Sequence, residues 1–209
     1  MSKKRAAIIL AGGSSSRMGR NKALLILGKS TMLDHIIRRV RRVANEVVVV
    51  VESLDDQLAY KRSIQEDVPI VQDRIQKKSP LVGIVTGLEN ISASYVSIHP
   101  CDTPLIEPDL VNFLFRSADG HDAVIPISPD GIMQPLNAVY ASENALRASI
   151  DALNAGELRC KNMIGRLDNV AYISSDQLRS LDPEFRTFLN INTSEDFQRL
   201  VRLEGAFER

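Results

Sequence analysis

The sequence has few cysteines and no long apolar run. Cys101 and Cys160 are the only cysteines among 209 residues, which excludes a disulfide framework and favours a reducing compartment. The first apolar run covers residues 6–11 and stops at Gly12, so it is too short for the apolar region of a signal peptide, about 7–15 residues. No run approaches the roughly 18 apolar residues of a membrane-spanning helix. We therefore expect a cytoplasmic protein with no membrane association.

The sequence also has no excess of charge of either sign. Lys and Arg together number 26, as do Asp and Glu, so the formal net charge at pH 7 is zero. Proteins that bind nucleic acid by neutralising phosphates are usually basic, so we expect no nucleic-acid partner. Hydrophobic residues make up 44% and charged residues 25%, which excludes disorder as the main state. There is no internal repeat and no linker-like stretch, so we expect residues 1–209 to form a single domain.

Short apolar runs alternate with helical patterns along the chain. Residues 46–51 are β-branched and continuously apolar, which is typical of a strand buried on both faces of a parallel sheet. Strands are predicted at 6–10, 46–51, 68–71, 95–99, 123–127, 137–140, 170–173 and 188–191. Helices are predicted after Thr31 and at 55–65, 80–91, 110–116, 142–154 and 194–203. This alternation predicts an α/β fold with a mostly parallel sheet and helices on both faces.

One predicted helix is rich in arginine. Arg38, Arg39, Arg41 and Arg42 follow Thr31 on the side of the helix away from its apolar residues. A solvated helix face is the favoured interpretation, and an anion-binding site is the alternative.

A glycine- and serine-rich stretch with basic residues follows the first predicted strand. In open α/β sheets, ligands bind beyond the carboxyl ends of the strands. Gly12 and Gly13 allow a close approach of the backbone and a positive φ, and successive N–H groups can cradle phosphate oxygens. Arg17 and Lys22 add positive charge for a polyphosphate. The stretch therefore predicts a phosphate-binding loop, with a plain strand-to-helix turn as the alternative.

Signatures of other sites are absent. The glycines are adjacent, so the dinucleotide pattern G-x-G-x-x-G is missing. Gly28-Lys29-Ser30 resembles the end of a Walker loop, but Ala23 occupies the position of the leading glycine, and the bulky residues 24–27 predict a strand and a turn. The histidines and cysteines have no zinc spacing, and no G-x-S-x-G hydrolase motif occurs.

Two aspartates follow later predicted strands. Asp73 comes after strand 68–71, and Asp102 comes after strand 95–99. Mg²⁺ is usually held by one or two carboxylates together with substrate phosphates, so Asp102 is a candidate magnesium ligand opposite the basic loop. The alternative is that Asp102 caps the turn before Pro104. Pro80 opens the next helix and would bring a helix N-terminus to the same edge.

Together these motifs resemble those of the molybdenum cofactor guanylyltransferases, the MobA family of nucleotidyltransferases. The resemblance runs from about residue 8 to residue 200. The motifs, in order, are Leu10-Ala11-Gly12-Gly13 with Arg17 and Lys22, Ser79-Pro80-Leu81-Val82-Gly83, Pro100-Cys101-Asp102-Thr103-Pro104, Gln134-Pro135-Leu136 and Asn190-Ile191-Asn192-Thr193.

The resemblance implies a Rossmann-like nucleotidyltransferase fold and an activity. The activity is transfer of GMP from GTP to Mo-molybdopterin with release of pyrophosphate. The implied partners are GTP and molybdopterin in its Mo or W form, together with molybdoenzyme acceptors and cofactor-biosynthesis proteins. The implied nucleotide ligands are Leu10, Ala11, Gly12, Gly13, Lys22, Asp73 and Asp102. The implied catalytic residues are Arg17, Lys22 and Asp102, with Mg²⁺ as cofactor on Asp102. The implied substrate contacts are Pro80, Leu81, Asn190 and Asn192.

Other functions stay open on the sequence. The cytidylyltransferase relatives typically have Ala-Ala-Gly where this chain has Ala11-Gly12-Gly13, which favours guanine. The alternatives are cytidylyl transfer to the same cofactor, nucleotidyl transfer to another metabolite phosphate, and a nucleotide-binding module without catalysis. The chain departs from the family at Asn21, where Asp is frequent, and at Glu52, where some members have Asn.

Overall fold

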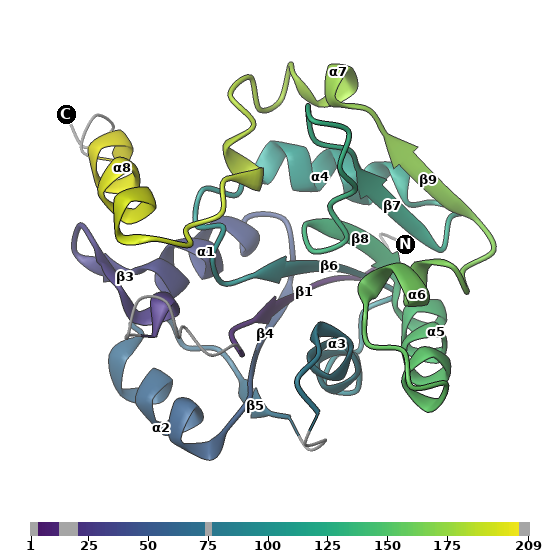
Figure 1. The fold of residues 1–209 in the computed structure, drawn as a ribbon, viewed down its shortest axis with the longest axis horizontal. Helices are drawn as coiled ribbons and strands as arrows, with labels where there is room; N and C mark the ends of the chain where they lie inside the picture. Colours follow the sequence, from purple (N-terminus) through teal and green to yellow (C-terminus); the bar gives the residue numbers. More distant parts are fainter. Residues whose placement is uncertain (1–3, 13–20, 74–76, 205–209) are drawn as a thin grey trace.

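The structure is a computed structural model, and it describes residues 4–12, 21–73 and 77–204 (Figure 1). A seven-stranded sheet forms its centre, with the strand order β5-β4-β1-β6-β8-β7-β9. The strands are β1 (Arg5–Leu10), β4 (Glu46–Val51), β5 (Ile70–Gln72), β6 (Tyr95–Pro100), β7 (Ala123–Pro126), β8 (Ala138–Ala141) and β9 (Val170–Ile173). Neighbouring strands pair in parallel except for β8, which is antiparallel to both β6 and β7. The prediction of a mostly parallel sheet is confirmed.

Helices cover both faces of this sheet (Figure 1). The helices are α1 (Met32–Val40), α2 (Leu54–Ser63), α3 (Pro80–Leu88), α4 (Pro108–Ser117), α5 (Ser142–Asn154), α6 (Cys160–Ile164), α7 (Ser175–Leu178) and α8 (Ser194–Glu204). Two 3-10 turns, η1 (Lys22–Leu24) and η2 (Arg186–Phe188), and a small antiparallel hairpin, β2 (Ile26–Leu27) with β3 (Ser30–Thr31), complete the elements. None of the helices described is both long and apolar enough to cross a membrane.

Strand β1 explains why the central strands are apolar throughout. Ala7 and Ile9 pack into the core cluster that includes residues of α1 and α4, whereas Ala6 and Ile8 pack into the cluster that includes residues of α3 and α5. Both faces are therefore buried, as expected for a parallel strand between helical layers. Helix α3 lies close to β1, since a Cβ on Gly87 would come within 2.7 Å of Ile8.

The predicted strand at 188–191 is wrong. The Asp182 carboxylate accepts hydrogen bonds from the backbone N–H of Arg186 and Thr187, at 2.9 and 2.8 Å, and this closes the turn η2 instead. The N–H of Ile191 donates to the carbonyl of Asp102 at 2.8 Å rather than to a neighbouring strand. Apolar residues occur here because the segment packs with the hairpin β2–β3 and with α8, in a third cluster that contains Ile191.

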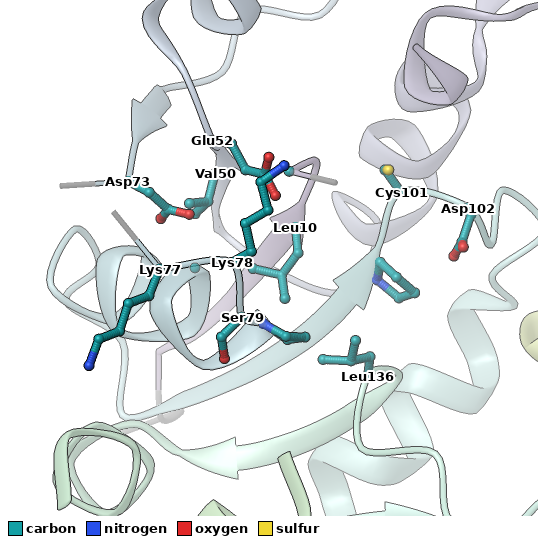
Figure 2. Close-up of a pocket in the computed structure, with 14 residues that line it drawn as sticks. Leu10, Val50, Glu52, Asp73, Lys77, Lys78, Ser79, Cys101, Asp102 and Leu136 are labelled. Atoms are coloured by element: carbon teal, nitrogen blue, oxygen red, sulfur yellow. The ribbon is translucent and has the colours of Figure 1, made fainter. Parts of the chain in front are cut away.

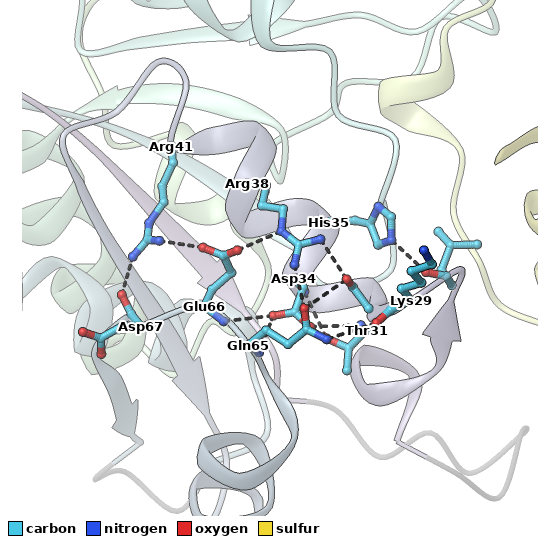
Figure 3. A network of polar contacts seen from close by, with 11 residues as sticks. Lys29, Thr31, Asp34, His35, Arg38, Arg41, Gln65, Glu66 and Asp67 are labelled. Carbon is cyan, nitrogen blue, oxygen red and sulfur yellow. Dashed lines mark hydrogen bonds and ion pairs between the residues drawn. The ribbon is translucent and has the colours of Figure 1, made fainter. Parts of the chain in front are cut away.

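A buried aspartate joins α1 to the segment that follows α2 (Figure 3). Asp34 is fully buried and accepts hydrogen bonds from Thr31 N–H at 2.9 Å and Thr31 Oγ1 at 2.7 Å, which caps α1. Its other oxygen accepts from the N–H groups of Gln65 and Glu66 at 2.8 and 3.2 Å. Burial by itself would raise the pKa of Asp34, but these hydrogen bonds bring it below its usual value.

The arginines of α1 extend this network at the surface. Arg38 Nε and Arg41 Nη1 bind the two oxygens of Glu66 at 2.8 and 2.6 Å, and Arg38 also donates to Ser30 Oγ in β3 at 2.8 Å (Figure 3). The side chains of Arg38 and Arg41 stay about two-fifths exposed, at 42% and 41%. These two arginines therefore form ion pairs on a partly solvated helix face.

Replacement of Asp34 by alanine should destabilise the protein by about 2–4 kcal/mol, because several buried donors lose their acceptor. Urea denaturation at pH 7 measures the change, with the exposed Lys61→Ala variant on α2 as a control within about 0.5 kcal/mol of wild type. The contribution of Asp34 is fully present above the unfolded pKa of about 3.9 and is lost as the pH falls through the lower folded pKa. Equal stabilities of wild type and D34A at pH 7 would contradict this role.

Candidate functional site

A cavity of about 270 Å³ opens at the carboxyl ends of the central strands (Figure 2). Residues from the ends of β1, β4, β5 and β6 line it together with the N-terminus of α3. The lining residues are Leu10, Gly12, Val50, Glu52, Asp73, Lys77, Lys78, Ser79, Pro80, Gly83, Pro100, Cys101, Asp102 and Leu136. This is the edge where ligands bind in open parallel sheets.

Gly12 follows β1 at a point of close approach between two chain segments. A Cβ at this position would lie 2.6 Å from Glu52 Cγ, so a larger residue would force the two strand ends apart. Gly12 does not adopt a positive φ, so proximity rather than a special backbone conformation requires glycine here. Gly13 and Arg17, predicted to continue the phosphate loop, lie outside the described residues.

A buried tyrosine holds the two ends of the predicted loop together. The hydroxyl of Tyr60, in α2, lies 2.9 Å from the carbonyl of Ala11 and 2.8 Å from Asn21 Oδ1. Asn21 Oδ1 also accepts from Ala23 N–H at 3.2 Å and caps η1. Tyr60 is fully buried, and burial raises its pKa, so the hydroxyl stays protonated. Asn21 therefore has a structural role at the position where it departs from the family.

Lys22 lies among the predicted site residues from distant parts of the chain. Its Nζ donates to Asn192 Oδ1 at 2.9 Å, across 170 positions in sequence. Its charge also acts on Asp102, whose pKa is raised by burial and partly lowered again by Lys22. Because Ile191 N–H is bonded to the Asp102 carbonyl, the segment before α8 is fixed against the end of β6. The structure thus brings Lys22, Asp102 and Asn192 together.

Two half-buried carboxylates lie on opposite sides of the cavity. Figure 2 shows Asp73 beside Glu52 on one side and Asp102 beside Cys101 on the other. Oδ1 of Asp73 and Oδ1 of Asp102 are each buried without a hydrogen-bond partner among the described residues. Burial raises the pKa of Asp73, a hydrogen bond from Thr86 lowers it, and the charge of Glu52 raises it. A carboxylate oxygen left unsatisfied in this way is costly unless a ligand binds to it.

The donor set fits magnesium rather than zinc. The two orphaned oxygens are carboxylate oxygens, which Mg²⁺ prefers. The described part of the chain has no group of three or more His, Cys, Asp or Glu side chains that could hold a metal alone, so phosphate oxygens would have to complete the shell. The Cys101 thiol lines the cavity, but burial, followed by the charge of Asp102, raises its pKa to about 12, so it stays protonated at neutral pH.

The remaining predicted residues are divided between the cavity and the structure around it. Pro80 lines the cavity at the start of α3, where Ser79 Oγ caps the helix by accepting from Leu81 N–H at 3.1 Å. Leu81 is fully buried in the core cluster beneath, so its side chain supports the cavity wall, and its contact with substrate stays a prediction. The side chain of Ala11 is also buried, and its backbone carbonyl accepts a hydrogen bond from the Tyr60 hydroxyl.

Asn190 lines a second, larger groove of about 870 Å³. The loop between β7 and β8, the turn η2 and helix α8 form this groove. Its lining residues are Ser128, Pro129, Asp130, Ile132, Gln134, Glu184, Phe185, Arg186, Phe188, Leu189, Asn190 and Arg199. Asn190 and Asn192 therefore lie on either side of Ile191, one at this groove and one at Lys22.

A family model, the MobA-like NTP transferase domain, matches residues 7–170. The chain belongs to the MobA-like NTP transferase family. It is 33% identical over 202 residues to a probable molybdenum cofactor guanylyltransferase of Methanosarcina mazei, with 94% of this chain and 90% of the relative covered. It is 35% identical over 197 residues to the corresponding Bacillus anthracis protein, with 93% and 94% covered.

A solved structure shows that the fold is shared beyond close sequence similarity. Molybdopterin-guanine dinucleotide biosynthesis protein A from Archaeoglobus fulgidus matches with a TM-score of 0.82 at 23% identity. The match covers 96% of this chain and 99% of that one. The sheet and its helical layers described above are therefore the nucleotidyltransferase fold of the MobA-like family.

Sequence reasoning missed several residues of this family site. Glu52 directly follows β4 and could have been found by examining the end of every predicted strand, as was done for Asp73 and Asp102. Lys77 and Lys78 stand just before the motif at Ser79 and line the cavity. Tyr60 had no detectable signal, because its partner atoms lie 39 and 49 positions away in sequence.

Replacement of Tyr60 by phenylalanine should lower stability by about 1–2 kcal/mol, because the Ala11 carbonyl and the Asn21 amide lose a buried hydroxyl. Thermal unfolding measures the loss. The matched control is Tyr172→Phe, since Tyr172 is 51% exposed on β9 and should tolerate removal of its hydroxyl. If the two variants lose the same stability, Tyr60 does not hold the loop ends.

Proposed function

We propose that this chain transfers GMP from GTP to the terminal phosphate of molybdopterin, in its Mo or W form, with release of pyrophosphate. The observation that carries the proposal is the pair of half-buried aspartates, Asp73 and Asp102, each with one buried oxygen that has no partner among the described residues, across a cavity beside Lys22. The family and the names of the curated relatives support the same reaction. The proposal treats residues 1–209 as a single functional domain.

The nucleotide occupies the cavity in this proposal. Leu10 and Gly12 line it, and Ala11 and Gly13 are proposed as further nucleotide contacts. Asp73 accepts from the nucleotide through its unpartnered oxygen. Lys22, with its ammonium held by Asn192 at 2.9 Å, is placed to neutralise phosphate charge. Asp102 would hold Mg²⁺, which supplies positive charge to the phosphate oxygens when bound.

Catalysis here requires alignment and charge rather than a general base. The attacking group is a phosphate and is already anionic, so no side chain has to remove a proton. Lys22 and the loop N–H groups offset the charge that accumulates around the α-phosphorus, and Arg17 is proposed to add its guanidinium. Burial of Asp102 removes competing water from its carboxylate, which strengthens any interaction with a cation.

The groove beside Asn190 is proposed to hold the acceptor. Phe188 offers an aromatic ring on which a flat heterocycle can stack, and Arg199 offers a cation for the acceptor phosphate. The bond between Ile191 N–H and the Asp102 carbonyl connects this groove to the metal-binding strand end. Pro80 forms part of the wall on the cavity side.

The proposal includes a cytoplasmic site of action and delivery of the product to molybdoenzymes or other cofactor-biosynthesis proteins. Cys101 and Cys160 are both free thiols, which is compatible with a reducing compartment.

A thermal-shift series with GTP, CTP, ATP and UTP, each with and without Mg²⁺, tests nucleotide use. We expect stabilisation with GTP and Mg²⁺ of about 2.7 kcal/mol at 100 times the dissociation constant. Asp102→Asn should stay folded and lose the Mg²⁺-dependent part of the stabilisation by GTP. The control Asp151→Asn, at an exposed position of α5, should behave as wild type. A shift selective for CTP would redirect the assignment to cytidylyl transfer, and no shift with any nucleotide would refute the transferase function.

Phe188→Ala tests the acceptor groove. It should raise KM for molybdopterin about tenfold, because a stacking surface worth roughly 1–1.5 kcal/mol is lost, and leave GTP stabilisation unchanged. Steady-state turnover with varied acceptor measures this, with the exposed Tyr172→Ala on β9 as a control for loss of an aromatic ring elsewhere. An unchanged acceptor KM in F188A would place the acceptor outside the groove.

A further inference from the structure

Asn137 has an unusual backbone conformation at the start of β8. Its φ is 130°, in the region that favours glycine, and the residue is 2% exposed. Such a conformation is strained for a residue other than glycine and persists where the surrounding structure fixes it. Residues of this kind concentrate at functional sites. Since glycine would adopt this φ freely, the Asn137 side chain must have a use.

That side chain contacts both sides of the turn that carries Asp102. Asn137 Oδ1 lies 3.0 Å from His99 Nδ1 and 3.5 Å from Thr103 Oγ1. His99 precedes Asp102 by three residues and Thr103 follows it directly, and both are buried. An amide oxygen can only accept, so His99 Nδ1 carries the proton. One amide therefore spans the turn from the neighbouring antiparallel strand.

The Asp102 carboxylate has little else to fix it. Its Oδ1 has no hydrogen-bond partner among the described residues. Among the described residues, the hydrogen bonds next to it run from Cys101 N–H to the Leu10 carbonyl at 3.1 Å, from Ile191 N–H to the Asp102 carbonyl, and from Thr103 Oγ1 to the Pro100 carbonyl at 3.4 Å. The side chains of His99 and Thr103 are the groups that connect this turn to Asn137.

We propose that Asn137 is a positioning residue for Asp102, and that it acts through His99 and Thr103. Groups that orient a metal ligand typically change metal affinity or activity by about 10–100-fold when removed. The strained backbone of Asn137 is retained because it aims the amide oxygen between these two donors. This inference rests on the proposed role of Asp102 in Mg²⁺ binding.

Three variants test it. Asn137→Gly removes the acceptor and fits the positive φ, and His99→Leu removes the closer of the two donors, which leaves Thr103 Oγ1 as the remaining partner of Asn137 Oδ1. Both should stay folded and raise the Mg²⁺ concentration for half-maximal GTP binding about tenfold. His99→Asn offers an amide N–H near the position of Nδ1 and should stay within about threefold of wild type. GTP binding without Mg²⁺ should be the same in all four proteins.

A spectroscopic readout makes the result independent of turnover. In ¹H–¹⁵N spectra of the imidazoles, His99 should appear as the Nδ1-protonated tautomer with slow proton exchange, and N137G should lose that protection. If N137G and H99L bind Mg²⁺·GTP as wild type does, Asn137 is structural only and the proposal is wrong. If neither variant folds, Thr103→Val removes the other donor to Asn137. The Mg²⁺ titration of GTP binding is then repeated with this variant, and an unchanged Mg²⁺ requirement would contradict the proposal.

The failure of the inference differs from failure of the proposed function. If wild type itself shows no Mg²⁺ dependence of GTP binding, both proposals fall, even where the His99 resonance shows the hydrogen bond. If wild type depends on Mg²⁺ and the Asn137 and His99 variants do so equally, only the positioning role falls.

Discussion

The parallel pairing of β1 with β4 and β6 is the constraint on which the site depends. In this register Leu10 lies opposite Val50 on one side and Pro100 on the other, so the three strands end together. The residues that follow them, Gly12, Glu52 and Asp102, therefore meet at one cavity although they are far apart in the sequence. A one-residue change of register would also exchange the two faces of β1 between the two cores, so packing on both sides fixes the geometry of the site.

Two aspartates of the site have buried oxygens without a partner among the described residues, whereas the buried aspartate of the core has none. Buried oxygens of Asp73 and Asp102 and the Nε2 of His99 have no partner among the described residues, and burial brings the pKa of His99 down to about 4. By contrast, the buried carboxylate of Asp34 has hydrogen bonds to both oxygens. The same residue type is thus satisfied where it holds the fold together and unsatisfied where a ligand would bind.

The central sheet could be predicted from the sequence because a continuous run of apolar β-branched residues, such as residues 46–51, is typical of a strand buried on both faces. It also pointed to Asp73 and Asp102, because strand ends are local features. The segment 188–191 was wrongly predicted as a strand, since apolar residues that pack beneath a turn have the same sequence pattern as those of a short strand. Leu81 shows the same limit: a motif position marks proximity to the site, but only the fold shows that its side chain faces the core. The roles of Tyr60 and Asn137 depend on tertiary contacts and have no local pattern.

Strand β8 runs antiparallel to its two neighbours, and this reversal brings the β7–β8 connection to the edge of the sheet where the cavity lies. Because β7 ends and β8 begins there, the connection between them, residues 127–137, lines the larger groove while its last residues reach the cavity. The strands that hold the cavity, β1, β4 and β5, are continuous with the core and cannot change length freely. The connecting loop can accept insertions and deletions at low cost. Changes of sequence and length in this loop would therefore reshape the larger groove while leaving the strand ends that line the cavity in place.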